Sequence, residues 1–329
     1  MNKLESDKTI NPGKTVDREK SFSRKGTIDK IFQGIVFAVA ISAVVIIFLI
    51  FVFVTKEALP IFYDENIQKT AGLSKLFTSQ IVDGQAVFHW QPHHPLYNVL
   101  PLIVGSIKVT LVAIFFGGPV AVAAAIYTSQ FASKKLREVI KPAIEMLAGI
   151  PSVVLGFFAI IILSGWMKEA LGLTERLNVF TAGVAMSFAV IPIIYTISED
   201  ALNSVPKSYS EASLALGATK IQTTMKVILP SVIPGIFAAL VLGFGRAIGE
   251  TMIVLMVSGN SPQLSMDFFE SVRTLTATIA AEMGELEVGG AHYTVLFFLG
   301  AMLFTFTFML NYIGDVVIHR VRRRLAGRN

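Results

Sequence analysis

The sequence predicts an all-α polytopic membrane protein that crosses the bilayer six times, with both termini in the cytoplasm. Hydrophobic residues make up 53% of the chain and charged residues only 16%, whereas soluble domains carry about 25% charged residues. The apolar residues gather in six long runs without alternation, which favours helices over the strands of a membrane barrel. Lysine and arginine lie mostly on one side of these runs, which orients the chain.

The first span is predicted over residues 31–55, which hold no formal charge. About 20 apolar residues are enough to cross the hydrocarbon core as a helix. The run is longer than the apolar part of a signal peptide, and no small-residue cleavage site follows it. We therefore expect this segment to remain attached as a membrane helix.

Five further spans are predicted, and two of them contain charged residues. Lys108 lies in the first of the five, and Arg246 and Glu250 lie in the fourth. Charged residues inside membrane spans usually face a bundle interior or a water-filled path. The five spans are Ser106–Tyr127, Ala143–Met167, Phe180–Ile197, Ile233–Val257 and Tyr293–Val317.

The connectors orient the chain through their lysines and arginines. The side that holds both tails and the connectors after the second and fourth spans carries twenty of these residues, and the other side carries six. The positive-inside rule places the basic side in the cytoplasm. This distribution accounts for the net charge of +5. Because no aromatic residues are interleaved with the basic ones, we expect no nucleic-acid binding.

The longest outside connector is residues 56–99, which is too short for a separate catalytic domain. Within it, Phe88, Trp90 and Tyr97 are predicted to form an aromatic belt at the membrane interface.

Signals for catalysis are weak. The chain has no cysteine, which excludes a disulfide scaffold, a zinc ribbon and thiol catalysis. His89, His93 and His94 lie close together, but no carboxylate or cysteine completes a metal-ligand set, so no metal is predicted. Gly13–Thr15 resembles the end of a phosphate-binding loop, but Lys8 stands where that loop needs its first glycine. The sequence therefore shows no recognisable nucleotide site.

Residues 204–219 predict a short helix on a bend at the cytoplasmic surface. Serines followed by Glu, Ala and Leu are typical of a helix start, and Gly217 is a natural stop. Thr219 is expected to cap a second helix that runs through Val227, and Pro230 to break the chain before the next span. Such a bend is either a handle for another protein or an ordinary surface hairpin.

This segment resembles the coupling loop of ABC-importer permeases. That pattern runs Glu-Ala-Ala, three residues, Gly, nine residues, Ile, one residue and Leu-Pro. Ser213 stands for the second Ala and Val227 for the Ile, and both changes are small. The residues at matching positions are Glu211, Ala212, Ser213, Gly217, Val227, Leu229 and Pro230.

Residues 95–320 resemble one branch of these permeases, the PstC type of the bacterial phosphate-specific importer. The coupling loop identifies only the superfamily, whereas the Arg-Ala-Ile-Gly-Glu-Thr and Arg-Thr-Leu-Thr runs narrow the likeness to phosphate permeases. PstA-type partners share much of this pattern, and the long first outside connector favours PstC. The matching stretches are Leu100–Gly105, Ala148–Gly156, Gly245–Thr251, Arg273–Ile279 and Glu282–Glu285.

The resemblance implies the type I ABC-importer permease architecture in the bacterial cytoplasmic (inner) membrane. It implies four kinds of partner: a PstA-like second permease, a PstB-like ATPase dimer, a PstS-like periplasmic phosphate-binding protein, and phosphate itself. ATP and Mg²⁺ would be bound by the ATPase, and this chain would hold no cofactor and catalyse no bond chemistry. The predicted segments are a basic tail (1–30), the first helix (31–55), the periplasmic connector (56–99), the permease core (100–317) with its coupling loop (199–230), and a second basic tail (318–329).

The predicted substrate path centres on Arg246 and Glu250, which share a helix face at i and i+4. Guanidinium matches phosphate oxygens and stays charged at any relevant pH. Glu250 would hold Arg246 between passages and keep phosphate from binding too tightly to leave. The alternative is a structural pair that neutralises itself. Thr251 belongs to the same run and is assigned to the path with them.

Two further residues are candidates for the path, each with a structural alternative. Lys108 either snorkels to the outer interface or attracts phosphate into the mouth. Gly149–Ser152 predicts a helix interruption and restart, where amide donors could face an anion, or a packing kink. Ser152 is the path candidate there.

Residues 258–291 contain Leu275, Ile279 and Met283 at helical spacing. They predict an amphipathic helix on the outer face, which either docks a periplasmic binding protein or packs over the bundle.

Three other functions remain open from the sequence. An ion-coupled secondary transporter could use Arg246 and Glu250 as a proton relay, but it leaves the coupling loop unexplained. A membrane-embedded enzyme lacks a convincing nucleophile–base pair or metal set. A permease of the same class for sulfate or molybdate is opposed only by the arginine-containing runs.

Overall fold

The computed structural model describes residues 12–82, 85–92 and 94–325. It divides into two compact units, residues 1–53 and 54–329, which are described separately. The ends of both predicted basic tails and His93 of the histidine group lie outside the described residues.

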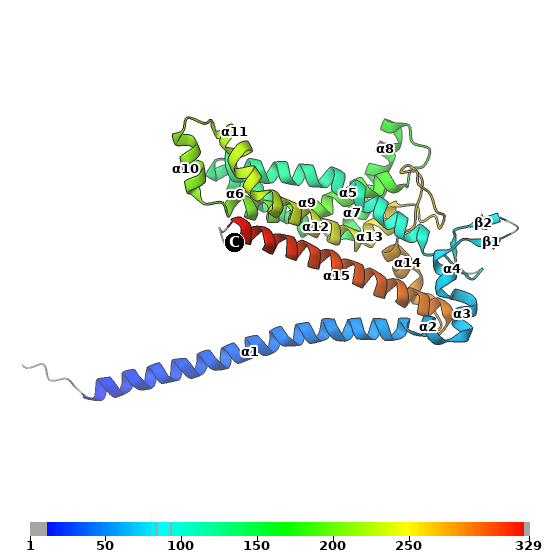
Figure 1. Ribbon diagram of the computed structural model, residues 1–329, viewed down its shortest axis with the longest axis horizontal. Coiled ribbons are helices and arrows are strands. Elements are labelled where there is room, and N and C mark those ends of the chain that lie inside the picture. Colours follow the sequence, from blue (N-terminus) through cyan, green and yellow to red (C-terminus); the bar gives the residue numbers. More distant parts are fainter. Residues whose placement is uncertain (1–11, 83–84, 93, 326–329) are drawn as a thin grey trace, which may run out of the picture. The chain divides into compact units, whose positions relative to one another are not determined.

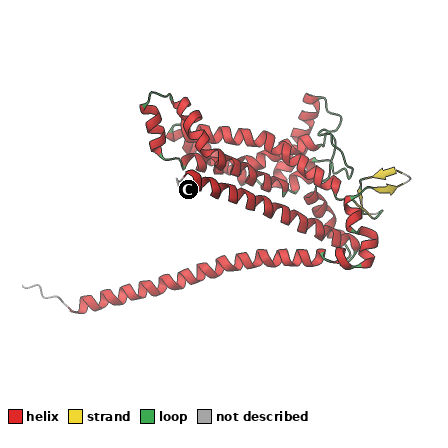
Figure 2. Ribbon diagram, viewed as in Figure 1, coloured by secondary structure: helices red, strands yellow, loops and turns green. Residues whose placement is uncertain are grey.

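Helices make up most of the described chain (Figure 2). The α-helices are α1 (Pro12–Ala58), α2 (Pro60–Tyr63), α3 (Glu65–Ala71), α4 (Leu73–Phe77), α5 (Leu100–Ile126), α6 (Lys134–Ala148), α7 (Ser152–Phe158), α8 (Ser164–Leu171), α9 (Val179–Asn203), α10 (Lys207–Ala215), α11 (Lys220–Thr223), α12 (Leu229–Ile248), α13 (Met252–Val257), α14 (Leu275–Glu282) and α15 (Ala291–Leu325). The π-helical turns are η1 (Tyr127–Phe131), η2 (Ala159–Leu163) and η3 (Thr224–Ile228), and η4 (Met283–Glu285) is a 3₁₀ turn. The strands are β1 (Gln80–Val82), β2 (Gln85–Val87), β3 (Trp90–Gln91) and β4 (Leu96–Tyr97).

Six helical stretches among the described residues are long and apolar enough to cross a bilayer, which confirms the predicted number. They are Asp29–Tyr63, Leu100–Phe131, Ser152–Leu171, Val179–Asn203, Lys220–Ile248 and Ala291–Val316. The first unit consists, where it is described, of the first part of α1.

The core of the second unit is built around α9, which packs against α5 and α12. Small residues let these helices approach closely, as is usual in membrane bundles. A methyl group at Gly183 of α9 would collide with Val112 of α5 and lie 3.0 Å from the carbonyl oxygen of Val109.

Replacing Gly183 by alanine is therefore expected to destabilise the bundle, at a cost of about 1–3 kcal/mol as in other overpacked cores. The measurement is the thermal aggregation temperature of the purified protein in detergent. The matched control is Gly165→Ala in α8, where an added methyl group meets nothing within 4 Å. Equal aggregation temperatures for the two variants would contradict the close α5–α9 contact.

The third span differs from the prediction, which began it at Ala143. Residues 143–148 belong to α6, an amphipathic helix that has no fully buried residue. The chain then breaks at Gly149–Pro151, and the span begins at Ser152. The predicted interruption is thus confirmed. It separates α6 from α7, because Pro151 has no N–H to donate to a carbonyl of the preceding turn.

The fifth span also differs, because Pro230 does not break the chain. α11, η3 and α12 run as one helical stretch from Lys220 to Ile248. The amide of Leu229 donates to the carbonyl of Thr224 across a widened π turn, and Pro230 then takes a position in the first turn of α12, where its missing N–H costs little. The span ends at Ile248 rather than Val257, and α13 follows after a short break.

The connector of residues 56–99 forms an outer cap together with the segments near residues 258–292. The amide of Trp90 donates to the carbonyl of Pro262 at 3.1 Å. The side chains of Trp90 and Tyr97 are 1% and 4% exposed and belong to the cap's own core. The predicted aromatic belt is therefore wrong for these two residues, because the cap covers them. Phe88 is partly exposed.

The predicted helix near residue 275 is confirmed as α14. Leu275 is buried in the core of the cap, with Ile279 and Met283 partly buried against it. α14 packs on α13, α15 and α5, so packing over the bundle is one of its roles. Its docking role stays a prediction.

Candidate functional site

The break between α12 and α13 brings together the charged pair that the sequence singles out. Nη1 of Arg246 lies 3.0 Å from Oε2 of Glu250. Arg246 is in the last turn of α12, and Glu250 lies just beyond its end rather than on the same helix face. The side chain of Arg246 is 49% exposed and that of Glu250 only 5%.

Glu250 is fixed on several sides. Its Oε1 accepts from the amides of Thr251 at 3.1 Å and Met252 at 3.2 Å, at the start of α13. Its carbonyl accepts from the hydroxyl of Thr276 at 2.8 Å. Among the described residues only Glu250 engages the guanidinium of Arg246. The carboxylate is thus anchored, whereas the guanidinium keeps donors for another group.

The pair lies at the end of the fifth span, beside α15. A methyl group at Gly245 would come 3.1 Å from Oδ1 of Asn311, which lies within the apolar stretch Ala291–Val316. An arginine that faces lipid at the centre of a span costs about 2.5–3.5 kcal/mol on insertion scales. The exposed part of Arg246 is therefore best satisfied by water or by another chain.

Two other predicted path residues lie near the same break. Thr251 is within it and starts α13. Ser152 begins α7, which packs against α13, with Gly156 in contact with Met256. The structure brings these elements together, and the role of Ser152 and Thr251 in a path stays a prediction.

Lys108 does not snorkel, which corrects that hypothesis. Its side chain is 4% exposed, and Nζ donates to the carbonyls of Ser265 at 2.9 Å and Asp267 at 2.5 Å. The ring of Phe268 lies 5.2 Å away. The loop that covers Lys108 supplies oxygens for the ammonium, so it has no need to reach the interface. Its contribution to a substrate path stays a prediction.

The segment that resembles a coupling loop projects from the end of the bundle where α15 ends (Figure 1). Gly217 has φ +86°, a left-handed conformation that glycine adopts without strain. Thr219 and Gln222 form a reciprocal capping box at the start of α11, and Ser213 contacts Thr223 through hydroxyls 2.9 Å apart. The predicted bend is therefore confirmed.

The outer face of α10 is open. Glu211 and Ala212 are exposed, and Leu216 at the tip is 90% exposed. Leu229 and Pro230 lie at the foot of this projection, where α12 begins. A projecting helix with an apolar tip and a carboxylate is suited to fit into a cleft of another protein.

A buried carboxylate that sequence analysis missed joins α6 to α9. Nζ of Lys141 lies 2.7 Å from Oε2 of Glu199, whose side chain is 2% exposed. The amide of Asn203 donates to the other oxygen at 2.8 Å. The hydrogen bond to Glu199 raises the pKa of Lys141 above its ordinary value. The pair contributes its stability while Lys141 is protonated and Glu199 is ionised. This contribution is lost as the pH rises through the raised pKa of Lys141, and it is also lost in acid, where the carboxylate takes up a proton.

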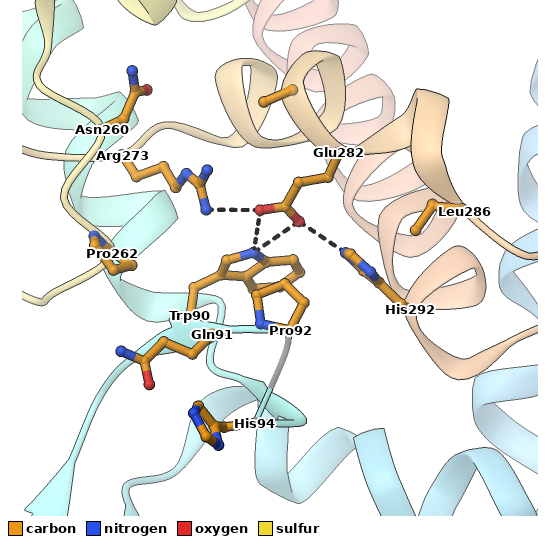
Figure 3. A pocket seen from close by; sticks show the side chains of 11 residues that line it. Trp90, Gln91, Pro92, His94, Asn260, Pro262, Arg273, Glu282, Leu286 and His292 are labelled. Carbon is orange, nitrogen blue, oxygen red and sulfur yellow. Dashed lines mark hydrogen bonds and ion pairs between the residues drawn. The ribbon is translucent and has the colours of Figure 1, made fainter.

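A second cluster that sequence analysis missed lies in the outer cap (Figure 3). The carboxylate of Glu282 contacts Nη1 of Arg273 at 2.7 Å and Nε2 of His292 at 2.8 Å, and accepts from Nε1 of Trp90 at 3.0 Å. These groups line a cavity of about 650 Å³. Burial and the charge of Glu282 raise the pKa of Tyr97. No local pattern could have revealed this cluster, because its members come from distant segments.

Known proteins resemble this chain over most of its length. Residues 117–324 match the family described as binding-protein-dependent transport system inner membrane component. The probable ABC transporter permease protein YqgH of Bacillus subtilis (strain 168) is 36% identical over 223 residues, which cover 67% of this chain and 72% of that protein. The phosphate transport system permease protein PstC of Xylella fastidiosa (strain Temecula1 / ATCC 700964) is 31% identical over 254 residues, covering 71% and 78%. PstC of Haemophilus influenzae (strain ATCC 51907 / DSM 11121 / KW20 / Rd) is 29% identical, covering 71% and 80%.

A solved structure has the same fold. A chain of the inward-facing MetNI methionine ABC transporter aligns with a TM-score of 0.52 at 20% identity and covers 70% of this chain and 99% of that chain. At that identity the likeness concerns the fold alone.

Proposed function

Since the chain belongs to the inner membrane components of binding-protein-dependent transport systems, we propose that it lines the path by which an ABC importer carries phosphate. The chain is the permease component of an ABC importer with type I architecture. It is a multi-pass inner membrane protein and a transport component rather than an enzyme. The substrate and the individual partners are the proposed part.

The observation that carries the phosphate proposal is the half-exposed guanidinium of Arg246 within the fifth membrane span. A permanently charged donor fork suits the oxygens of phosphate. Among the described residues of the second unit, none covers the exposed side of the guanidinium, which supports a path completed by a second, PstA-like permease. The similar proteins named PstC support the same substrate, whereas the similar protein YqgH carries no substrate in its name.

The anchored carboxylate of Glu250 gives the site a way to release its substrate. Nη1 of Arg246 lies 3.0 Å from Oε2 of Glu250. Phosphate would compete with that carboxylate for the guanidinium, which limits how tightly the anion is held. A path needs binding that favours entry but still permits exit, and a resident counter-charge provides this balance.

The proposed partners follow from the two ends of the molecule. A PstB-like ATPase dimer, which binds ATP and Mg²⁺ itself, would receive α10 in a cleft on the cytoplasmic side. A PstS-like binding protein would deliver phosphate at the outer cap. Closure of the ATPases on ATP would move α10 and, through the continuous stretch from Lys220 to Ile248, the end of α12 that bears Arg246.

The test is ATP hydrolysis by the reconstituted complex in liposomes, with binding protein and with phosphate, sulfate or molybdate as the anion. In the presence of the binding protein, we expect phosphate to stimulate ATP hydrolysis and sulfate and molybdate to leave it unchanged. Stimulation by sulfate or molybdate instead of phosphate would keep the permease class and reject the substrate. Entry of radiolabelled phosphate into liposomes that lack the ATPase would favour an ion-coupled secondary transporter, in which Arg246 and Glu250 relay protons.

A further inference from the structure

The helix α14 connects the charged pair to the outer cap. Near its first end, the hydroxyl of Thr276 donates to the carbonyl of Glu250 at 2.8 Å. That carbonyl follows the end of α12, where carbonyls lack partners within the helix. Thr276 is 7% exposed, so water does not readily replace this bond. The hydroxyl therefore fixes the backbone of the residue that holds Arg246.

The far end of α14 carries Glu282, which gathers contacts from three other segments (Figure 3). Trp90 comes from β3, Arg273 precedes α14, and His292 begins α15. The six helical steps from Thr276 to Glu282 span about 9 Å. One short helix thus has the outer cluster at one end and the charged pair at the other.

The first half of α14 is held in the core of the unit. Leu275, Ala277 and Thr278 are buried. The amide of Leu275 also donates to Oγ of Ser106 on α5 at 3.0 Å. A packed helix of this length moves as a unit, because close-packed interiors transmit displacements rather than absorb them. A displacement of the Glu282 cluster would therefore be passed along α14 toward the break that carries Glu250.

We propose that Thr276 is a positioning residue, through which α14 links the outer cluster to the Arg246–Glu250 pair. This inference rests on the proposed function, in which a substrate-loaded binding protein meets the outer cap and the pair faces the path. Docking displaces the Glu282 cluster, α14 follows, and the Thr276 hydroxyl shifts the backbone of Glu250. The carboxylate then changes its hold on Arg246, which prepares the guanidinium to receive the anion.

The test compares two isosteric substitutions in the reconstituted complex. Thr276→Val removes the hydroxyl that holds Glu250 and keeps the side-chain shape. Thr278→Val is the matched control, because the hydroxyl of Thr278 donates only to the carbonyl of Thr274 within the same helix, at 2.8 Å. The readout is the ratio of ATP hydrolysis with and without phosphate-loaded binding protein.

We expect Thr276→Val to lower this ratio about fivefold, the factor that one typical hydrogen bond is worth. Thr276→Ser retains the hydroxyl and should recover most of the stimulation, and Thr278→Val should stimulate like the wild type. If Thr276→Val does not assemble, Thr276→Ala removes the same hydroxyl with less volume. Full stimulation in either hydroxyl-deficient variant would overturn the inference, as would an equal loss in Thr278→Val.

A double-mutant cycle with Glu282→Gln tests the link itself. Alone, this substitution removes the carboxylate charge from the outer cluster and should lower stimulation. If α14 carries the signal through Thr276, adding it to Thr276→Val should cause little further loss. Multiplicative losses would overturn the link. A wild-type complex that phosphate does not stimulate would instead reject the proposed function, so the two failures are distinguishable.

Discussion

Replacing Arg246 by glutamine is expected to abolish phosphate uptake, by about a hundredfold or more, while the complex still assembles. Truncating one member of a hydrogen-bonded charge pair costs about 2–5 kcal/mol in binding when the pair is buried. Here the member removed is Arg246, and its partner in the path would be the substrate anion, which would bury the guanidinium on binding. Assembly should survive because the side chain is 49% exposed and bonds only Glu250 among the described residues. The measurements are radiolabelled phosphate uptake and co-purification of the ATPase and the second permease.

Two further variants separate the charge and the geometry of Arg246 from a general change in net charge. Arg246→Lys keeps the charge but loses the planar donor fork, so we expect uptake between the wild type and the glutamine variant. Lys168→Gln removes one positive charge from the exposed surface of α8 and should transport normally. Wild-type uptake in Arg246→Gln would remove this residue from the path.

Reversing the charge of Glu211 is the second change with a large expected effect. Glu211→Arg should abolish the stimulation of ATP hydrolysis by phosphate-loaded binding protein and leave the permease in the membrane. Glu211 is exposed on α10, so folding does not require it, whereas like charge or lost pairing at an interface costs several kcal/mol. Hydrolysis by the reconstituted complex measures the effect.

Glu138→Arg is the matched control for this reversal. Glu138 is exposed on α6, outside the projecting bend, on the predicted cytoplasmic side. The Glu138→Arg substitution changes the net charge by the same amount as Glu211→Arg and leaves α10 unaltered. Normal stimulation in Glu211→Arg, or an equal loss in Glu138→Arg, would contradict the assignment of α10 as the element that engages the ATPase.

The Glu282 cluster and the contacts of Lys108 show why interactions between distant segments escape sequence analysis. Glu282 is one carboxylate in a connector, and nothing near it along the chain indicates Trp90, which lies 192 positions away. Lys108 had two sequence interpretations, and neither foresaw a loop that brings two backbone carbonyls to its ammonium. In both cases the partner is supplied by a distant segment.

Local patterns predict what depends on local physics. Six apolar runs predict six spans because burying a helix in lipid needs only length and hydrophobicity, and Gly217 predicts a bend because its φ is a property of one residue. Arg246 and Glu250 predict a contact because they lie four positions apart. Tertiary packing decided three further features. A π turn accommodates Pro230, and the outer cap buries Trp90 and Tyr97. The hydroxyl of Thr276 joins α14 to the backbone of Glu250. These outcomes depend on which distant surfaces meet, and sequence spacing does not encode that.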